Sequence, residues 1–264
     1  MIDLAPDLLR EGSLTVEGRL ASASNATLLC RLGAADRDVE GGIRCIYKPV
    51  AGERPLWDFP DGTLAGREVA AYLVSEATGW HVVPPTVLRD GPFGPGMCQL
   101  WVEEDGTGLV DVVGREAVPD GWLRVLDARG ASGEPVTLVH ADDQRLRRMA
   151  LFDIVINNAD RKGGHVLIEA DGTVLGIDHG VCFHVEPKLR TVLWGWSGEA
   201  VTDAERETLN LLGSALQGDL GRRLASMLTD DEVAATVSRV EALLTDGTFP
   251  VPVGDRMPIP WPPF

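Results

Sequence analysis

Residues 157–180, NNADRKGGHVLIEADGTVLGIDHG, contain two short polar segments, NNADR and DHG, on either side of two apolar runs. The apolar runs, HVLIEA and TVLGID, are joined by Asp-Gly, a dipeptide typical of a tight hairpin turn. Because a hairpin folds the chain back on itself, Asp160 before it and Asp178 after it can face the same cleft. The stretch therefore predicts a site that carries two carboxylates.

The composition limits the class of protein. The chain has 264 residues, of which 44% are hydrophobic, enough for one large domain or for two lobes with a shared cleft. Its formal net charge is −16. Phosphate groups repel a strongly acidic protein, so we expect no nucleic-acid partner and no binding to anionic membrane surfaces.

The chain lacks the usual signals for export. Its first residues, MIDLAPDLLREG, are acidic and lack the apolar core of a signal peptide, and no apolar run reaches transmembrane length. We therefore expect a cytoplasmic protein without integral membrane association. The four cysteines have no metal-type spacing and are expected to be buried, reduced thiols: Cys30, Cys45, Cys98 and Cys182.

The first hundred residues predict a β-rich unit. Residues 13–20 and 28–33 form a hairpin around the small-residue tip ASASNAT, and residues 43–50 form a third strand. Residues 63–79 predict a helix that ends at a glycine. Two more strands follow, within residues 82–91 and 96–104. The order is three strands, a helix and two strands.

The second half predicts mostly helices. Residues 104–135 are rich in Gly, Asp and Glu and show no assignable period. Residues 140–158 show a mostly apolar stripe at helical spacing, with Asp142 or Asp143 as cap. Capping boxes at Thr202 and Thr229 open two further helices. The proline-rich tail, residues 250–264, is expected to be an extended strap that packs Trp261 and Phe264 on the surface.

At this point the motifs resemble a known family. Asn158-Ala-Asp-Arg, then a hairpin, then Ile177-Asp-His-Gly is similar to the catalytic and metal loops of the phosphatidylinositol 3-/4-kinase superfamily. The chain looks closest to type II phosphatidylinositol 4-kinases, to persistence-toxin serine/threonine kinases and to an actinobacterial branch of phosphatidylinositol 3-/4-kinase-like proteins. The resemblance implies an α+β, two-lobed protein-kinase-like fold. The β-rich small lobe would comprise residues 1–104, and the mostly helical large lobe residues 105–264.

The resemblance also implies roles for the two aspartates and their neighbours. Asp160 would be the catalytic aspartate that orients the acceptor hydroxyl, and Asp178 the principal magnesium ligand. Arg161 and Lys162 would offset charge on the transferring phosphoryl group. Taken separately, each motif has a structural alternative: Asp160-Arg161 could be a salt bridge within a loop, and Asp-His-Gly could be a turn. The order of the two motifs, together with the upstream residues, favours a catalytic and a metal-binding role.

The upstream residues would hold ATP. Lys48, on the third strand, matches the lysine that contacts the α- and β-phosphates, and Glu68 lies in the predicted helix, placed to pair with it. The hairpin tip would cover the phosphates, because small residues let backbone N–H groups approach; a plain turn is its alternative. The tip residues are Ser22, Ser24 and Asn25. The strand expected to contact the adenine contains Gln99, Leu100, Trp101 and Val102.

One position departs from the family pattern. The superfamily usually has an asparagine five residues after the catalytic aspartate, where it binds a second metal, but this chain has His165. Imidazole is a poorer ligand for Mg²⁺ and a better one for Mn²⁺. The histidine is compatible with another metal, with a one-metal site, with a phosphate contact, with a purely structural role and with lost activity.

The implied activity is transfer of the γ-phosphoryl group from ATP, with Mg²⁺ or Mn²⁺, to a hydroxyl of a protein or a small molecule. The alternatives are a nucleotide-binding pseudokinase, a phosphoinositide kinase and an adenylyl transferase on the same fold. The acidic composition and the few basic residues after the Asp-His-Gly motif, Lys188 and Arg190, do not favour a phosphoinositide head group. Trp194 and Trp196 lie where an acceptor would bind, but core packing is their favoured role.

Overall fold

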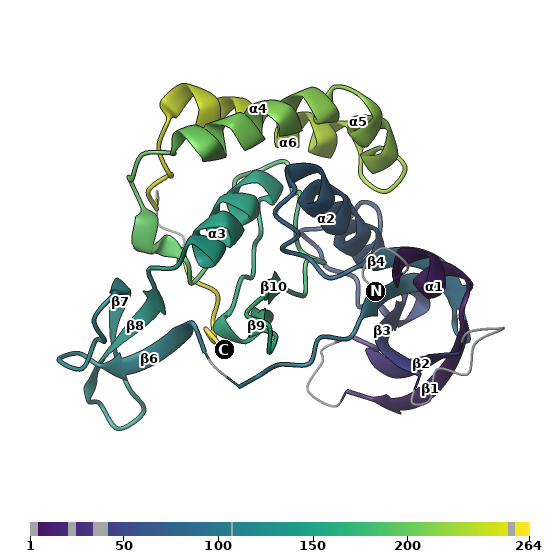
Figure 1. The fold of residues 1–264 in the computed structure, drawn as a ribbon, viewed down its shortest axis with the longest axis horizontal. Helices are drawn as coiled ribbons and strands as arrows, with labels where there is room; N and C mark the ends of the chain where they lie inside the picture. The colour runs from purple at the N-terminus through teal and green to yellow at the C-terminus, as the bar shows by residue number, and fades with distance from the viewer. Residues whose placement is uncertain (1–4, 21–24, 34–41, 107, 253–256) are drawn as a thin grey trace.

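The computed structural model of this chain describes residues 5–20, 25–33, 42–106, 108–252 and 257–264. It has two lobes (Figure 1): a sheet-rich small lobe and a large lobe in which helices predominate. The extended segment after the small-lobe sheet connects them along one side of the molecule.

A five-stranded antiparallel sheet in the order β1-β2-β3-β5-β4 forms the small lobe. The expected strands are all present, and their bounds are β1 (Ser13–Arg19), β2 (Leu28–Gly33), β3 (Ile43–Pro49), β4 (Thr86–Gly91) and β5 (Gly94–Leu100). The short helix α1 (Ala5–Glu11), which the sequence analysis did not predict, packs against β4 and β5.

The two faces of this sheet have different neighbours. Cys45 and Tyr47 of β3 belong to a small core with Leu9 of α1. Successive side chains of a strand point to opposite faces, so Lys48 points to the other face, opposite Met97 of β5. Met97 belongs to the main core, which the large lobe shares. The alternation of β3 thus turns its one lysine away from α1. All four cysteines are buried and free, as expected.

Helix α2 (Leu64–Thr78) joins the two lobes. It occupies the predicted positions, with Thr63 as N-cap and Gly79 as C-cap in the left-handed region, φ +67°. Glu53 adds a second cap, since its carboxylate accepts from the backbone N–H groups of Leu64 and Ala65. The helix is buried almost all round, because it packs on the small-lobe sheet and on two helices of the large lobe, α4 (Asp203–Leu216) and α5 (Asp219–Leu224).

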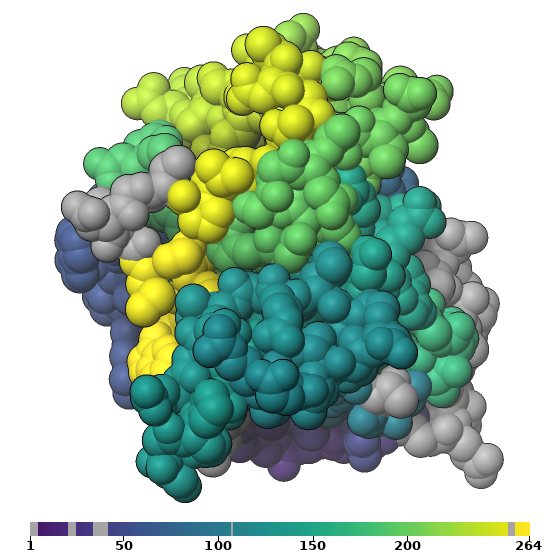
Figure 2. All heavy atoms as spheres, turned by 90° about the vertical axis from the view of Figure 1, so that its left-hand side faces the viewer, coloured from purple at the N-terminus to yellow at the C-terminus, as the bar shows by residue number. Residues whose placement is uncertain are grey.

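The segment that sequence analysis left unassigned folds into a second antiparallel sheet, in the order β6-β8-β7. Its strands are β6 (Val110–Gly114), β7 (Trp122–Arg129) and β8 (Pro135–Ala141). Only the central strand is substantially buried, which explains why the edge strands carry no clean alternation. His140 and Ala141, expected at the start of a helix, instead end β8. Figure 2 shows this sheet in teal, facing the viewer.

The large lobe contains the elements around the opening sequence stretch. Helix α3 (Gln144–Ile156) is capped by Asp143, and the hairpin of β9 (Val166–Ile168) and β10 (Val174–Gly176) follows. Both predicted capping boxes are present, at Thr202 before α4 (Asp203–Leu216) and at Thr229 before α6 (Asp230–Asp246). Helix α5 (Asp219–Leu224) lies between them. Trp196 is buried in the main core, so core packing is confirmed for it.

The tail runs beside the loop that follows α3. The carbonyl of Pro263 accepts from the N–H of Gly163, and that of Pro258 accepts from Thr191 N and Trp194 Nε1. The strap prediction is therefore confirmed for the backbone and wrong for Trp261, which is 76% exposed. The ring of Phe264 lies against Gly163, although the residue is half-exposed. Figure 2 shows the tail in yellow beside the three-stranded sheet.

In the part of the chain that the structure describes, we find no helix of the length and apolarity needed to span a membrane.

The capping boxes make a first prediction. Replacing Thr202 by Ala removes the oxygen that accepts from Glu205 N and should lower the free energy of unfolding by about 1 kcal/mol in chemical denaturation. The control is Thr208→Ala within the same helix, where the hydroxyl only bonds back to the Ala204 carbonyl. This change should be neutral or slightly stabilising. Equal effects of the two substitutions would contradict the capping assignment.

Candidate active site

Three distant parts of the chain meet at the ammonium group of Lys48. Its Nζ lies 2.7 Å from Glu68 Oε1 of α2 and 2.9 Å from Asp178 Oδ1, just after β10. Burial lowers the pKa of Lys48, but the two carboxylates outweigh burial and raise it, which keeps the side chain protonated. The structure thus brings together the Lys48 and Glu68 that the sequence suggested as a pair.

Glu68 is buried, although a glutamate in the middle of a helix is commonly exposed to solvent. It is only 1% exposed, and its second oxygen, Oε2, accepts from the backbone N–H of His179 at 2.9 Å. Burial raises the pKa of this carboxyl, whereas Lys48 and the His179 N–H lower it. The carboxylate is therefore held between a cation on β3 and the backbone of the Asp-His-Gly motif.

Asp178 combines an unusual backbone with an accessible side chain. Its φ is +61°, in the left-handed region that few residues other than glycine adopt. The charge of Lys48 holds the pKa of its carboxyl well below the usual range. Its side chain is half-exposed, at 51%, so a second carboxylate oxygen remains open. The geometry presents an ionised carboxylate at a fixed position.

Asp160 lies on the loop after α3 and is partly buried. Its backbone N–H donates to Asn158 Oδ1, and Lys162 Nζ lies 3.5 Å from its Oδ2. Burial raises the pKa of the Asp160 carboxyl; Lys162 offsets part of this, and the negative charge of Asp178 adds to it. The two carboxylates therefore act on each other electrostatically, as expected if they face one cleft.

Asn157 and Asn158 hold this loop in place. Asn157 is the α3 C-cap, as predicted, with φ +53°. Its side chain donates to the carbonyls of His184 and Glu186 and accepts from Lys188 N, which fixes the chain after the Asp-His-Gly motif. Asn158 donates to Asp153.

Arg161 has a different position from the one the sequence suggested. It is completely buried and pairs with Asp153 through two bonds, Nε to Oδ2 at 2.8 Å and Nη2 to Oδ1 at 2.9 Å. Its remaining bonds go to the carbonyls of His165 and Ile177 and to the His179 ring. The guanidinium therefore ties the loop after α3 to the segment after β10 and does not face the opening. Lys162 keeps its place beside Asp160.

His165 faces Asp178 across the hairpin. Its Nε2 lies 3.7 Å from Asp178 Oδ2, and burial lowers the pKa of the imidazole to about 4. The ring is therefore neutral near pH 7, with a lone pair available for a metal. Its Nδ1 is buried and has no hydrogen-bond partner in the described structure.

A carboxylate oxygen and a neutral imidazole nitrogen this close together are a donor set that would suit one divalent cation, and Asp178 and His165 would be the residues that hold it. Within the described residues, no group of three or more His, Cys, Asp or Glu side chains is arranged to hold a metal. The protein would then supply two ligands and leave the other positions to a bound phosphate or to water.

The expected adenine-binding residues end the small-lobe sheet. Gln99 is buried and its amide donates to Thr86 Oγ1, so its side chain is used within the small lobe. The N–H groups of Leu100 and Trp101 donate to the carbonyls of Pro85 and Arg44. Val102 is buried. The side chain of Gln99 and the backbone N–H groups of Leu100 and Trp101 thus already have hydrogen-bond partners within the protein.

The hairpin tip is described only in part. Asn25 Oδ1 accepts from the backbone N–H of Arg54 at 2.9 Å, which holds the end of the tip against the segment after β3. Ser22 and Ser24 lie outside the described residues.

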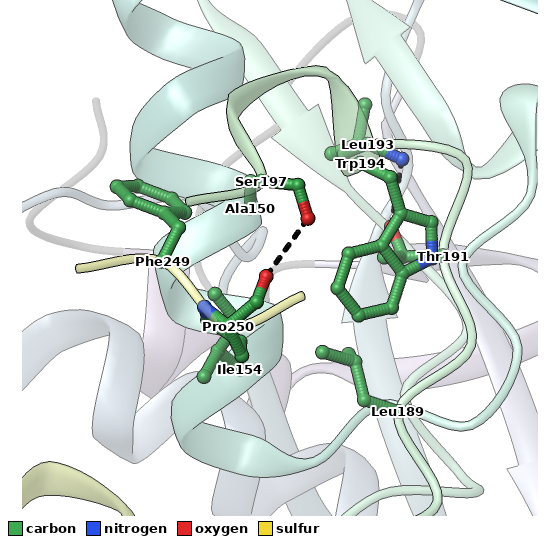
Figure 3. A pocket seen from close by; sticks show the side chains of 9 residues that line it. All are labelled: Ala150, Ile154, Leu189, Thr191, Leu193, Trp194, Ser197, Phe249 and Pro250. Atoms are coloured by element: carbon green, nitrogen blue, oxygen red, sulfur yellow. Dashed lines mark hydrogen bonds between the residues drawn. The ribbon is translucent and has the colours of Figure 1, made fainter. Parts of the chain in front are cut away.

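A small apolar hollow elsewhere in the large lobe lacks the chemistry of this site. Figure 3 shows it between α3, the segment around Trp194 and the start of the tail, where Ser197 Oγ donates to the Pro250 carbonyl at 2.9 Å. No acidic or basic side chain lines it.

Sequence reasoning missed two buried charged residues behind the site, Arg67 and Asp153. Asp153 gave a signal, because it stands in the apolar stripe of the helix at 144–156. A charged residue at a buried position requires a partner. Nothing in the sequence identified Arg161 as that partner.

Solved structures of kinases share the fold. The Golgi casein kinase aligns over 92% of this chain and 73% of its own, with a TM-score of 0.55 and 12% identity. Its form with Mn/ADP bound gives a TM-score of 0.57 over 92% and 74% of the two chains. Hydra Fam20 with sugar covers 93% of this chain and 87% of its own, with a TM-score of 0.53 and 15% identity. The predicted two-lobed kinase-like fold is confirmed.

Sequence similarity defines the family. The chain is 52% identical over 267 residues to Protein Rv2133c of Mycobacterium tuberculosis (strain ATCC 25618 / H37Rv), covering 97% of this chain and 94% of that protein. The chain therefore belongs to the family of Protein Rv2133c. It is also 27% identical over 172 residues to phosphatidylinositol 4-kinase gamma 4 of Oryza sativa subsp. japonica, 58% of this chain but only 26% of that protein. No family model matches the sequence.

The position of Arg161 makes a second prediction. Arg161→Lys removes the two-bond pairing with Asp153 and leaves buried charge poorly compensated, so it should lower the free energy of unfolding by about 3 kcal/mol or more. The matched control is Arg222→Lys, whose pair with Asp219 is exposed and should change stability by less than about 1 kcal/mol. Equal stability of the two variants in chemical denaturation would show that Arg161 is not structural.

Proposed function

We propose that this protein is an ATP-dependent phosphotransferase that moves the γ-phosphoryl group to a hydroxyl of a protein or a small molecule. The observation that carries the proposal is the contact of Lys48 Nζ with both Glu68 and Asp178. Phosphoryl transfer needs a cation at the phosphates and a carboxylate for the metal, both at fixed positions. The kinase fold of the solved relatives supports the same proposal.

In this proposal the nucleotide lies between the lobes. Lys48 contacts its phosphates while Glu68 keeps the lysine oriented. The hairpin tip, with Ser22, Ser24 and Asn25, covers the phosphates, and residues 99–102 lie along the adenine. One solved relative holds Mn/ADP, which supports a nucleotide and a divalent metal as the ligands. We place the boundary between the lobes at residues 104 and 105, in the extended segment after β5.

Asp178 and His165 would hold the metal. A bound Mg²⁺ or Mn²⁺ neutralises charge on the phosphates and helps to orient them for transfer. Asp178 suits this role because Lys48 keeps its carboxyl ionised and because one oxygen remains open. His165 adds a neutral nitrogen donor, which favours Mn²⁺ over Mg²⁺.

Asp160 would orient the acceptor hydroxyl and receive its proton. Its raised pKa makes it a better proton acceptor than a fully solvated aspartate, and Lys162 beside it offsets part of the rise. Lys162 would also balance charge on the transferring group. Arg161 contributes by holding the loop in position, since its side chain is buried.

A phosphoinositide acceptor is the second candidate, and the partial match to the rice phosphatidylinositol 4-kinase is the observation that favours it. Incubation with ATP and phosphatidylinositol vesicles tests it directly. Phosphorylated lipid in that assay would show that the acceptor is a phosphoinositide and not a protein or a soluble small molecule.

Intact-mass measurement of protein acceptors separates phosphoryl from adenylyl transfer, since the two groups add very different masses. A pseudokinase would bind nucleotide without either product.

The third prediction concerns nucleotide binding. Calorimetric titration should show ATP binding that requires a divalent metal, and Asp178→Asn should weaken it about tenfold or more, because about 1.4 kcal/mol of interaction energy is one decade in affinity. Asp171→Asn is the matched control, because this exposed aspartate only accepts from Thr173 N in the hairpin turn. ATP binding that ignores both the metal and Asp178→Asn would reject the proposed site.

The fourth prediction concerns the metal. We expect the wild-type protein to bind ATP more tightly with Mn²⁺ than with Mg²⁺, and His165→Asn to shift the preference toward Mg²⁺, because an amide oxygen is the harder donor. The ratio of the two dissociation constants is the measurement. An unchanged ratio in His165→Asn would remove His165 from the metal site and leave Asp178 as its protein ligand.

A further inference from the structure

Arg67 precedes Glu68 on α2 but faces the large lobe. It is 1% exposed, and its Nη2 lies 2.6 Å from Glu232 Oε1 of α6. Its Nη1 donates to the Cys182 carbonyl at 2.7 Å, and Nη2 also donates to the Asp61 carbonyl at 3.0 Å. One guanidinium therefore joins α2, α6 and the chain just after the Asp-His-Gly motif.

The partner carboxylate is itself held firmly. Glu232 is the third residue of α6, where its backbone N–H donates to Thr229 Oγ1 and its Oε2 accepts from Thr229 N. Only Oε1 is left for Arg67. Because the capping box fixes the rotamer of Glu232, the ion pair fixes α2 relative to the large lobe.

The two neighbouring residues of α2 thus act on the same segment from two sides. Glu68 accepts from His179 N, and Arg67 donates to the Cys182 carbonyl four residues after Asp178. Glu68 also holds Lys48 of the small-lobe sheet. A shift or rotation of α2 would move Glu68 away from both Lys48 and the His179 N–H.

We infer that Arg67 is a positioning residue, whose buried pair with Glu232 sets α2 so that Glu68 meets Lys48. The pair of Lys48 and Glu68 is then assembled before any ligand binds. The inference deepens the proposed function, on which its consequence for nucleotide binding rests. The geometric claim concerns only Lys48, Glu68 and α2, and can be tested without a nucleotide.

The chain has three lysines, and Lys162 is the internal reference for Lys48. Lys188 does not serve as a reference, because it lies over the Phe59 ring that Arg67 also contacts. The labelling rate of each amine with an acylating reagent is followed by peptide mass spectrometry on the ligand-free protein. Arg67→Met should raise the labelling of Lys48 several-fold, because the amine loses its hydrogen bond to Glu68 and becomes more accessible to the reagent. The labelling of Lys162 should stay unchanged. Glu68→Gln removes the carboxylate that contacts Lys48 directly, so its labelling rate is the reference for the size of the increase.

A matched control separates positioning from general destabilisation. Arg147 also pairs with the third residue of a capping box, Glu205 of α4, with Nε 2.9 Å from Oε1 and side chains 13% and 9% exposed. Arg147→Met should leave Lys48 labelling unchanged relative to Lys162. Arg67→Lys, which keeps the charge, should restore part of the protection. If Arg67→Met does not fold, Glu232→Gln tests the same ion pair from the other side. This change replaces the carboxylate by an amide of the same shape. It should raise Lys48 labelling, but by less than Glu68→Gln does.

Two results would overturn the inference: unchanged Lys48 labelling in folded Arg67→Met or Glu232→Gln, or an equal rise in Arg147→Met. ATP affinity measured in parallel distinguishes the two proposals. If the wild-type protein binds no nucleotide but Arg67→Met still exposes Lys48, the positioning role stands and the proposed function fails. If ATP binds and Lys48 labelling is unchanged, the positioning role fails alone.

Discussion

The contact of Lys48 with Glu68 and Asp178 is the interaction on which the arrangement of the site depends. It joins residues 20 and 130 positions apart and connects the small-lobe sheet, α2 and the large lobe at one ammonium group. A lysine between two carboxylates keeps its charge despite burial, and one of the carboxylates is in turn held ionised by the lysine. In a chain with a net charge of −16, the lysine offsets the repulsion between the acidic groups that meet here.

A buried ion pair lies behind Asp160 and Asp178 and holds the segments that carry them. Asp153 and Arg161 form a pair with no exposed side-chain area, and Arg161 reaches both the His165 and the Ile177 carbonyl. The loop with Asp160 and the segment with Asp178 are thereby tied to one guanidinium. Such a pair contributes little net stability but tolerates few alternative geometries, because each lost contact leaves a buried charge unpaired. We interpret this buried ion pair as the source of the site's rigidity.

Local patterns in the sequence sufficed for most elements and for part of the site. The strands, the helix caps and the Asp-Gly turn are set by nearby residues, so the elements that carry Lys48, Glu68 and Asp178 could be predicted in advance. The meeting of these three residues at one site was implied by the family resemblance. The β6-β8-β7 sheet escaped because its edge strands are exposed and lack a period. The orientation of the Arg161 side chain could not be predicted for a different reason. A loop side chain points to its tertiary partner, and Asp153 is eight residues away on a helix whose buried face only the fold reveals.

The histidine at position 165 is consistent with this balance of charge. Asp178 already lies in contact with Lys48 and within electrostatic reach of Asp160. A third carboxylate at position 165 would add negative charge beside Asp178 and compete for the same lysine. A buried imidazole stays neutral near pH 7, because burial lowers its pKa to about 4, and still offers a nitrogen lone pair 3.7 Å from the Asp178 carboxylate. A histidine at this position therefore offers a donor and adds no charge, which is what the proposed metal site requires.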